Sequence, residues 1–369
     1  MRRHVLIAFV IVAAVGSSVR SGGAHITRVV PPPALSESPT FEGRVFGPDG
    51  KVGPYEKLRG RAFGEVDPDD PRNAVITDIK LAPRNARGRV EYSMDVFILK
   101  PVDLKRGNHK LLLDFNNRGE MRVAALNDAP LNNDPTKVAH AGTGFVMNLG
   151  YTIVGNGWDF GATKDDAGMT ISVPVARNPD GSSITGPSYE YINFDDAKSV
   201  RYELTYPPAT RDQSKATLTV RASLDDKPTE VPASGWEYVD DKTIRLLPAG
   251  TPFKQSHVYE FSYTAKDPVV AALGLAATRD LVAFLRYADR DEAGTANPLA
   301  GDVQHTFSFS ISQPSRTLND FQALGSNEDE RGRRVIHGML KWTGGANGDQ
   351  INYRFAQTGR TERNRQNHL

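Results

Sequence analysis

The stretch His305–Phe321, HTFSFSISQPSRTLNDF, decides how the rest of the chain is interpreted. Strand-forming residues alternate with small ones from Thr306 to Ile311, and the run stops at Ser312. Pro314 suits the first turn of a helix, because a backbone N–H at that position would have no helical partner. The stretch therefore predicts a strand, a sharp turn at Ser312 and a helix.

A serine at the tip of a strand-to-helix turn is the arrangement of a nucleophile elbow, in which the turn holds the serine Oγ out of the sheet. The usual elbow has glycine two residues before and two residues after the serine, whereas this chain has Ser310 and Pro314 there. The local pattern leaves two interpretations open. Ser312 is either a catalytic nucleophile or a serine that only caps the helix.

Composition narrows the class of protein. The chain has 369 residues, more than the roughly 250 to 300 at which one core stops growing, so we expect one domain with an insertion or two domains. A net charge of +1 gives no electrostatic reason to expect nucleic acid as a partner. The chain has no cysteine, which excludes disulfides, thiolate metal sites and a cysteine nucleophile. Its histidines and carboxylates lack the spacing of metal ligands, so the sequence predicts neither a metal nor a cofactor.

The N-terminus has the features of a secretory signal peptide, which we expect to span residues 1–24. Arg2 and Arg3 precede the apolar run Val5–Val15, and small residues follow it. The run is shorter than the roughly 20 apolar residues that cross a bilayer, although an uncleaved anchor remains an alternative. We expect a secreted or periplasmic protein with no membrane partner after cleavage of the signal.

Hydrophobic patterns divide the mature chain. The patterns predict a linker at residues 25–44 and the first part of an α/β domain at residues 45–162. They predict a β-rich insertion at residues 163–265 and the second part of the α/β domain, which contains Ser312, at residues 266–369. Strands are predicted at 55–65, 74–82, 90–100, 110–115 and 150–157, a helix from Asp267 onward, and a further strand at 334–339. If the strands at 110–115 and 150–157 share a sheet with the Ser312 strand, residues 116–119 and 156–160 lie beside Ser312.

An ordered set of segments carries a resemblance that covers nearly the whole mature chain. The segments are Gly60–Ala86, Asn117–Gly119, Gly150–Trp158, Arg279–Tyr287, Ser312–Gln313, Asn327–Glu330 and Asn352–Arg360. Together they resemble a bacterial family of exported proteins described only as alpha/beta-hydrolase-domain proteins. The resemblance implies an alpha/beta-hydrolase-like central sheet with a β-rich insertion, and cleavage of a small-molecule ester.

The resemblance also implies roles for individual residues. The family's elbow reads Gly-x-Ser-Gln-Ser-Gly-Arg, and Ser312, Gln313 and Arg316 match it. Ser312 would be the nucleophile, and the oxyanion hole would use the backbone N–H of Gln313 and that of Asn117 or Arg118. The departures are Ser310 for the first glycine, Pro314 for the serine and Ser315 for the second glycine, and the last two could displace the Gln313 N–H.

The C-terminal end of the sequence departs further from the pattern of the alpha/beta-hydrolase family. In this fold the triad acid and histidine follow later strands than the serine, whereas this sequence ends at Leu369, soon after the Ser312 helix. We therefore expect the C-terminal strands to be missing, with an exposed sheet edge that favours aggregation. His305, His337 and His368 are not in the place expected of the base. The alternative function is a catalytically impaired or truncated hydrolase-like binding protein.

Overall fold

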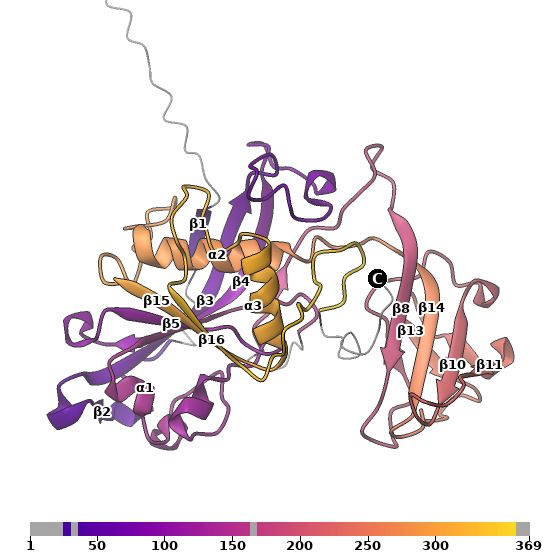
Figure 1. The fold of residues 1–369 in the computed structure, drawn as a ribbon, viewed down its shortest axis with the longest axis horizontal. Helices are drawn as coiled ribbons and strands as arrows, with labels where there is room; N and C mark the ends of the chain where they lie inside the picture. The colour runs from indigo at the N-terminus through magenta and orange to yellow at the C-terminus, as the bar shows by residue number, and fades with distance from the viewer. Residues whose placement is uncertain (1–24, 31–35, 163–167, 359–369) are drawn as a thin grey trace, which may run out of the picture.

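The computed structural model describes residues 25–30, 36–162 and 168–358, which form a larger main body and a smaller second body (Figure 1). The main body contains β1 His25–Val30, β2 Val45–Phe46, β3 Gly53–Val66, β4 Val90–Pro101, β5 Lys110–Asp114, α1 Phe145–Asn148, β6 Thr152–Asn156, β7 Ile171–Ser172, α2 Leu273–Tyr287, β15 His305–Ile311, α3 Gln313–Ala323 and β16 Gly338–Trp342. The second body contains β8 Thr185–Ile192, β9 Tyr202–Glu203, β10 Thr217–Arg221, β11 Thr229–Val231, β12 Trp236–Tyr238, β13 Thr243–Leu246 and β14 Val258–Lys266.

The main body is built on one mixed sheet in the order β1-β3-β4-β6-β5-β15-β16, with β2 beside β3 and β7 beside β4. The first part of the sheet, from β1 to the β4–β6 pair, is antiparallel, and β6, β5, β15 and β16 run parallel. Every residue of β6 is buried, as expected of a strand with both faces covered. The carboxyl ends of β6, β5 and β15 therefore meet at one edge, where α3 begins.

Two apolar clusters cover the two faces of this sheet. On one face, α2 and α3 pack their buried side chains against β1, β3, β4 and β5. On the other face, a smaller cluster gathers around Phe309 of β15, Phe97 of β4 and Met147 of α1. The strands are thus fixed between layers, and the loops that follow their carboxyl ends are held in place.

The second body consists of a four-stranded antiparallel sheet, β11-β10-β14-β8, and a three-stranded sheet, β12-β13-β9. Their core is rich in aromatic residues, with Trp236 and Phe261 fully buried in edge-to-face contact. This body falls in the stretch expected as a β-rich insertion, with its last strand β14 ending at Lys266.

The expected alpha/beta-hydrolase-like fold is wrong. Strand accounts for 32% and helix for 18% of the structure, the sheets are mixed or antiparallel, and the described residues contain only three α-helices. The sequence reason lies partly in the connection from β5 to β6, where an alpha/beta-hydrolase-like sheet would have a crossover helix. It contains Pro130, Pro135 and several Asn and Asp residues, which disfavour helix, and forms only 3₁₀ turns and the four-residue α1.

Local predictions also need correction. The expected linker at 25–44 contains β1, which pairs with β3 because its β-branched residues continue the antiparallel sheet. Residues 74–82 form turns and a 3₁₀ helix, not a strand. The helix expected from Asp267 begins at Leu273, and the strand expected at 334–339 is β16, which begins at Gly338. Within the described ranges, no helix is both long enough and apolar enough to cross a bilayer. The expected signal peptide lies outside those ranges.

Candidate active site

Ser312 occupies the turn between β15 and α3 with an unusual backbone. Its φ of 70° and ψ of −124° lie in a region that glycine populates and other residues rarely enter. Its N–H donates to the Trp342 carbonyl at 2.8 Å, which ties the turn to the end of β16. The Ser312 side chain is exposed and makes no capping hydrogen bond, so the interpretation as a helix-capping serine has no support in this geometry.

Ser310 and Ser315, which stand in place of the two glycines of the family's elbow, form a hydrogen bond with each other. Ser310 and Ser315 are both buried, and their Oγ atoms lie 2.9 Å apart in a hydrogen bond. The Ser315 Oγ also lies 3.1 Å from the carbonyl oxygens of Ser310 and Trp342, and its single O–H can donate to either of them. The hydroxyls therefore fill the narrow space between β15 and α3, and the sharp turn forms without glycine on either side.

The turn that follows β5 lies against Ser312. Arg118 and Gly119 both have positive φ, 53° and 86°, and Asn117 and Glu120 exchange backbone hydrogen bonds across them. The side chain of Asn117 donates to the Ile311 carbonyl at 3.3 Å, and the Arg118 Nε donates to Gln313 Oε1 at 3.1 Å. The structure therefore brings together all four predicted site residues. The Asn117 N–H already donates to the Glu120 carbonyl at 2.9 Å, whereas Arg118 contacts the Gln313 side chain directly.

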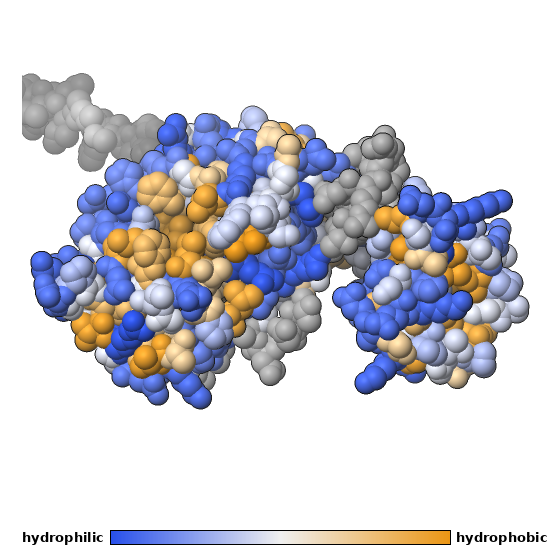
Figure 2. Space-filling view, turned by 60° about the horizontal axis from the view of Figure 1, so that its bottom comes forward, coloured by the Kyte–Doolittle hydropathy of each residue, from blue (hydrophilic) through white to orange (hydrophobic). Residues whose placement is uncertain are grey.

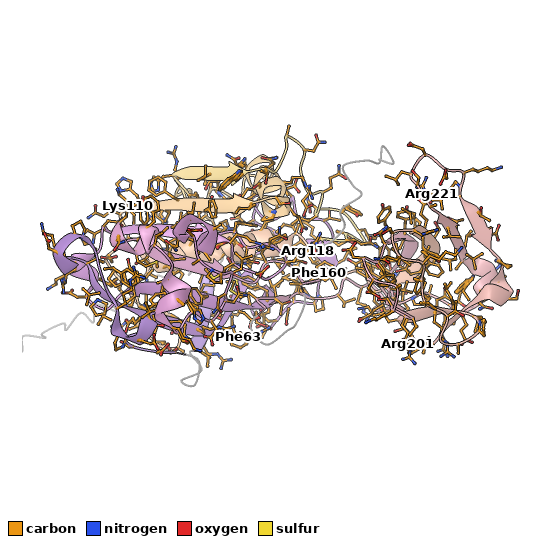
Figure 3. The ribbon with its side chains drawn as sticks, turned by 90° about the horizontal axis from the view of Figure 1, so that it is seen from below. Phe63, Lys110, Arg118, Phe160, Arg201 and Arg221 are labelled. Atoms are coloured by element: carbon orange, nitrogen blue, oxygen red, sulfur yellow. The ribbon has the colours of Figure 1, made fainter. Side chains whose placement is uncertain are left out.

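This edge of the main body faces the second body. Figure 3 shows Lys110, at the start of β5, at the far end of the main body, and Arg118, after its end, on the side of the second body together with Phe160. The Phe160 ring lies 6.1 Å from that of Tyr206, whose hydroxyl donates to the Ala356 carbonyl at 2.6 Å. Ser312 is thus placed near a junction between two bodies, where binding sites often occur.

A buried polar network holds Gln313, and the sequence did not predict it. The Gln313 Nε2 donates to Asp349 Oδ2 at 3.0 Å and to the Thr358 carbonyl, and the Thr358 hydroxyl donates to Asp159 Oδ1. Asp349 and Asp159 are fully buried. Asp159 belongs to the segment 156–160 expected beside Ser312, whereas Asp349 lies in a glycine-rich stretch that has no periodic pattern.

Burial raises the pKa of Asp159. The hydroxyl of Thr358 and the N–H of Gly161 oppose this shift, Asp349 adds to it, and Arg118 reduces it. The second oxygen of the carboxylate, Oδ2, has no hydrogen-bond partner within the part of the chain that the structure describes. Carboxylates with strongly perturbed pKa values are often found at functional sites.

Asp114, at the end of β5, is a second buried carboxyl group near this edge. Its Oδ2 accepts the N–H groups of Arg122 and Val123, both at 2.6 Å, and burial raises its pKa to about 7 despite these bonds. An unfolded aspartate ionises near 3.9. The folded state therefore holds one more proton between about pH 4 and 7, so the stability contributed by Asp114 is full below about pH 4 and is lost as the pH rises through 7.

We therefore expect Asp114→Asn to remove a pH dependence. Between pH 4 and 8, the free energy of unfolding of the wild type should fall relative to that of the variant, by up to about 4 kcal/mol. Urea denaturation at several pH values measures this difference. Asp103→Asn, which removes an exposed carboxylate, is the control and should follow the wild type. Parallel curves for wild type and Asp114→Asn would contradict the assignment.

The described histidines next to the parallel strands lie away from Ser312. His305 begins β15 and His337 precedes β16, and their rings pack 5.2 Å apart at the opposite end of the strands. With about 3.3 Å per residue, that end is roughly 20 Å from Ser312. His368 lies outside the described residues. Among the described residues, no histidine forms a hydrogen bond with the Ser312 side chain, and no group of three or more His, Asp or Glu is arranged to hold a metal.

An open groove of about 770 Å³ lies elsewhere, between β1, β3 and β4, with Arg28, Phe63 and Tyr92 in its lining. None of its lining residues belongs to the Ser312 site, so it adds nothing to that chemistry. Comparisons with known protein families, with curated proteins and with solved structures give no match for this chain. The resemblance described above therefore stays a prediction.

Proposed function

We propose that the protein is an exported serine hydrolase that cleaves small carboxylic esters, with Ser312 as the nucleophile. The observation that carries the proposal is Ser312 itself, whose backbone is strained and whose exposed hydroxyl makes no capping hydrogen bond to α3. Residues in such conformations cost about 1 to 3 kcal/mol each and gather at functional sites. A serine that only linked a strand to a helix would not need this conformation.

In the proposed reaction, Ser312 Oγ attacks the ester carbonyl carbon while a base takes its proton, and the carbonyl oxygen gains the negative charge. The Gln313 N–H belongs to the first turn of α3, whose N–H groups lack helical partners and stabilise negative charge. Arg118 would supply the second N–H. As the intermediate collapses, the base returns its proton to the leaving oxygen, so that the alcohol departs and an acyl group stays on Ser312. The same base then takes a proton from water, which attacks the acyl group, releases the carboxylic acid and restores the serine hydroxyl.

The network around Gln313 supports this role. Its side chain is held at three points, by Arg118, Asp349 and Thr358, so the backbone N–H that follows Ser312 is fixed in position. Donors fixed before the reaction are worth about 10² to 10³ in rate each. His305 and His337 lie too far away to act as the base, and substitution of His368, which lies outside the described residues, tests whether it takes that role.

One observation favours the alternative, a binding protein without catalysis. In the described part of the chain, the Ser312 side chain makes no hydrogen bond to a base that would activate it. A serine without such a partner is a weak nucleophile.

Hydrolysis of 4-nitrophenyl acetate and butyrate by the purified mature chain tests the proposal. We expect release of 4-nitrophenol above the rate without protein, lost in Ser312→Ala and strongly reduced in His368→Gln. Ser326→Ala, which changes a serine outside the site, is the control and should keep the wild-type rate. Equal rates for the wild type and Ser312→Ala would overturn the proposal and favour the binding protein.

A further inference from the structure

Strand β16 is the last strand of the main sheet. It pairs with β15 on one side, from Phe307 opposite Gly338 to Ile311 opposite Trp342, and among the described strands none pairs with its other side. The backbone N–H and C=O groups of this five-residue strand that face away from β15 can therefore add a further strand.

The two faces of β16 differ in what packs against them. Lys341 points toward α3, where its Nζ donates to Asn319 Oδ1 at 2.7 Å. Because side chains alternate along a strand, Leu340 and Trp342 point to the other face. Their side chains are 57% and 52% exposed, among the highest values for large apolar residues in the described chain.

The exposed apolar surface continues across the neighbouring strands. Phe307 and Ile311 of β15 lie in register with Gly338 and Trp342, and Leu112 of β5 lies in register with Phe307. All three are only half-buried. Figure 2 shows hydrophobic side chains gathered on the part of the main body where Figure 1 places β5, β15 and β16. We call these residues, with Leu340 and Trp342, the β16 strip.

We propose that the β16 edge pairs antiparallel with the same strand of a second copy of this chain, about a two-fold axis at Leu340. In this register, Leu340 faces Leu340 of the partner subunit, and Trp342 faces Gly338 of the partner subunit. Directly opposite residues lie on the same face of an antiparallel pair, so each indole covers a position that has no side chain.

This self-complementarity is the reason for choosing a second copy. A Cβ at Gly338 would lie 3.2 Å from the Phe307 ring, so the glycine leaves that ring open on the exposed face. Packing an aromatic side chain over a strand glycine is a known way to stabilise an edge. The two-fold axis places one such contact at each end of the paired strands, and an interface of this kind closes at two copies.

The surface area that two copies would bury at this edge indicates a weak dimer. An aromatic side chain buries about 150 to 250 Å² when fully covered, so the exposed half of Trp342 offers roughly 100 Å². The whole strip then amounts to a few hundred Å² per copy, against about 800 Å² per partner in a standard stable interface. We therefore expect a dissociation constant in the micromolar range or weaker.

Sedimentation velocity of the wild type from about 1 to 300 µM tests the proposal. We expect monomer at the low end and dimer at the high end. Leu340→Lys and Leu340→Glu should each stay monomeric, because each variant opposes two like charges across the axis. An equal mixture of the two variants should form dimers again. Val45→Lys, at a position 56% exposed on β2, is the matched control and should dimerise like the wild type.

Trp342→Thr removes the indole without adding a charge, and we expect it to weaken the dimer at least tenfold while the near-ultraviolet circular dichroism of the fold persists. This variant keeps the test valid should the charged variants fail to fold. A monomeric wild type over the whole range would overturn the proposal. So would Leu340→Lys dimers as tight as the wild type, or a mixture of the charged variants that stays monomeric.

Discussion

The variant Ser312→Gly should be more stable than the wild type by about 1 kcal/mol and should lose all ester hydrolysis. Glycine adopts a φ of 70° without the clash that Ser312 tolerates, so the strain of the turn is relieved. The Ser312 side chain is exposed, and with the described residues it makes no hydrogen bond that its removal would break. The greater freedom of glycine in the unfolded chain offsets part of the gain.

Urea denaturation of three proteins measures this effect. Ser312→Ala keeps the Cβ and therefore the strain, so its free energy of unfolding should equal that of the wild type within about 0.5 kcal/mol. Both variants should lack hydrolysis, whereas only Ser312→Gly should gain stability. A Ser312→Gly protein less stable than Ser312→Ala would show that the turn is not strained.

The second prediction with a large expected effect concerns the free energy of unfolding and not the rate of hydrolysis. Arg279→Met should lower the free energy of unfolding by about 3 to 5 kcal/mol, because it leaves buried carboxylates without their cation. Arg279 and Asp280 of α2 are each 1% exposed, and the Arg279 Nε donates to Asp280 Oδ1 at 2.8 Å. The buried Glu330 carboxylate lies 3.8 Å from the same guanidinium, and the Tyr92 hydroxyl donates to Asp280.

Thermal and urea denaturation check this expectation. Arg290→Met, at an exposed arginine just after α2, is the control and should change the free energy of unfolding by less than about 0.5 kcal/mol. The double variant Arg279→Met/Asp280→Leu should lose less than the single variant, since it removes one of the unpaired charges. A loss below about 1 kcal/mol in Arg279→Met would contradict the view that this cluster supports the packing of α2 on the sheet.

Much of the candidate site could be predicted from the sequence, because short local patterns of residues determine where its strands end and its helix begins. The change from alternating residues to Gln313-Pro314 marks the end of a strand and the start of a helix, and β15 and α3 meet at Ser312 as expected. The buried runs at 110–115 and 150–157 became neighbouring strands β5 and β6, so the turns that follow them reach the same edge.

The predicted alpha/beta-hydrolase-like fold is wrong because that fold needs helices between its strands. Periodicity predicted α2, whereas the connection between β5 and β6, which is rich in asparagine and contains two prolines, forms short 3₁₀ helices and turns. Strand β1 was missed because it directly follows the expected signal peptide. The contacts of Gln313 with Asp349 and Thr358 were missed because they join residues 36 and 45 positions apart through a segment that has no periodic pattern.

The central claim is that Ser312 is an activated nucleophile, and labelling with a fluorophosphonate tests it most directly. The mature wild type, Ser312→Ala and Ser326→Ala are treated with the probe and read by intact mass and peptide mapping. The account predicts one adduct on Ser312 in the wild type and in Ser326→Ala, and none in Ser312→Ala. A folded wild-type protein that takes up no probe, or takes it up equally in Ser312→Ala, would contradict the claim.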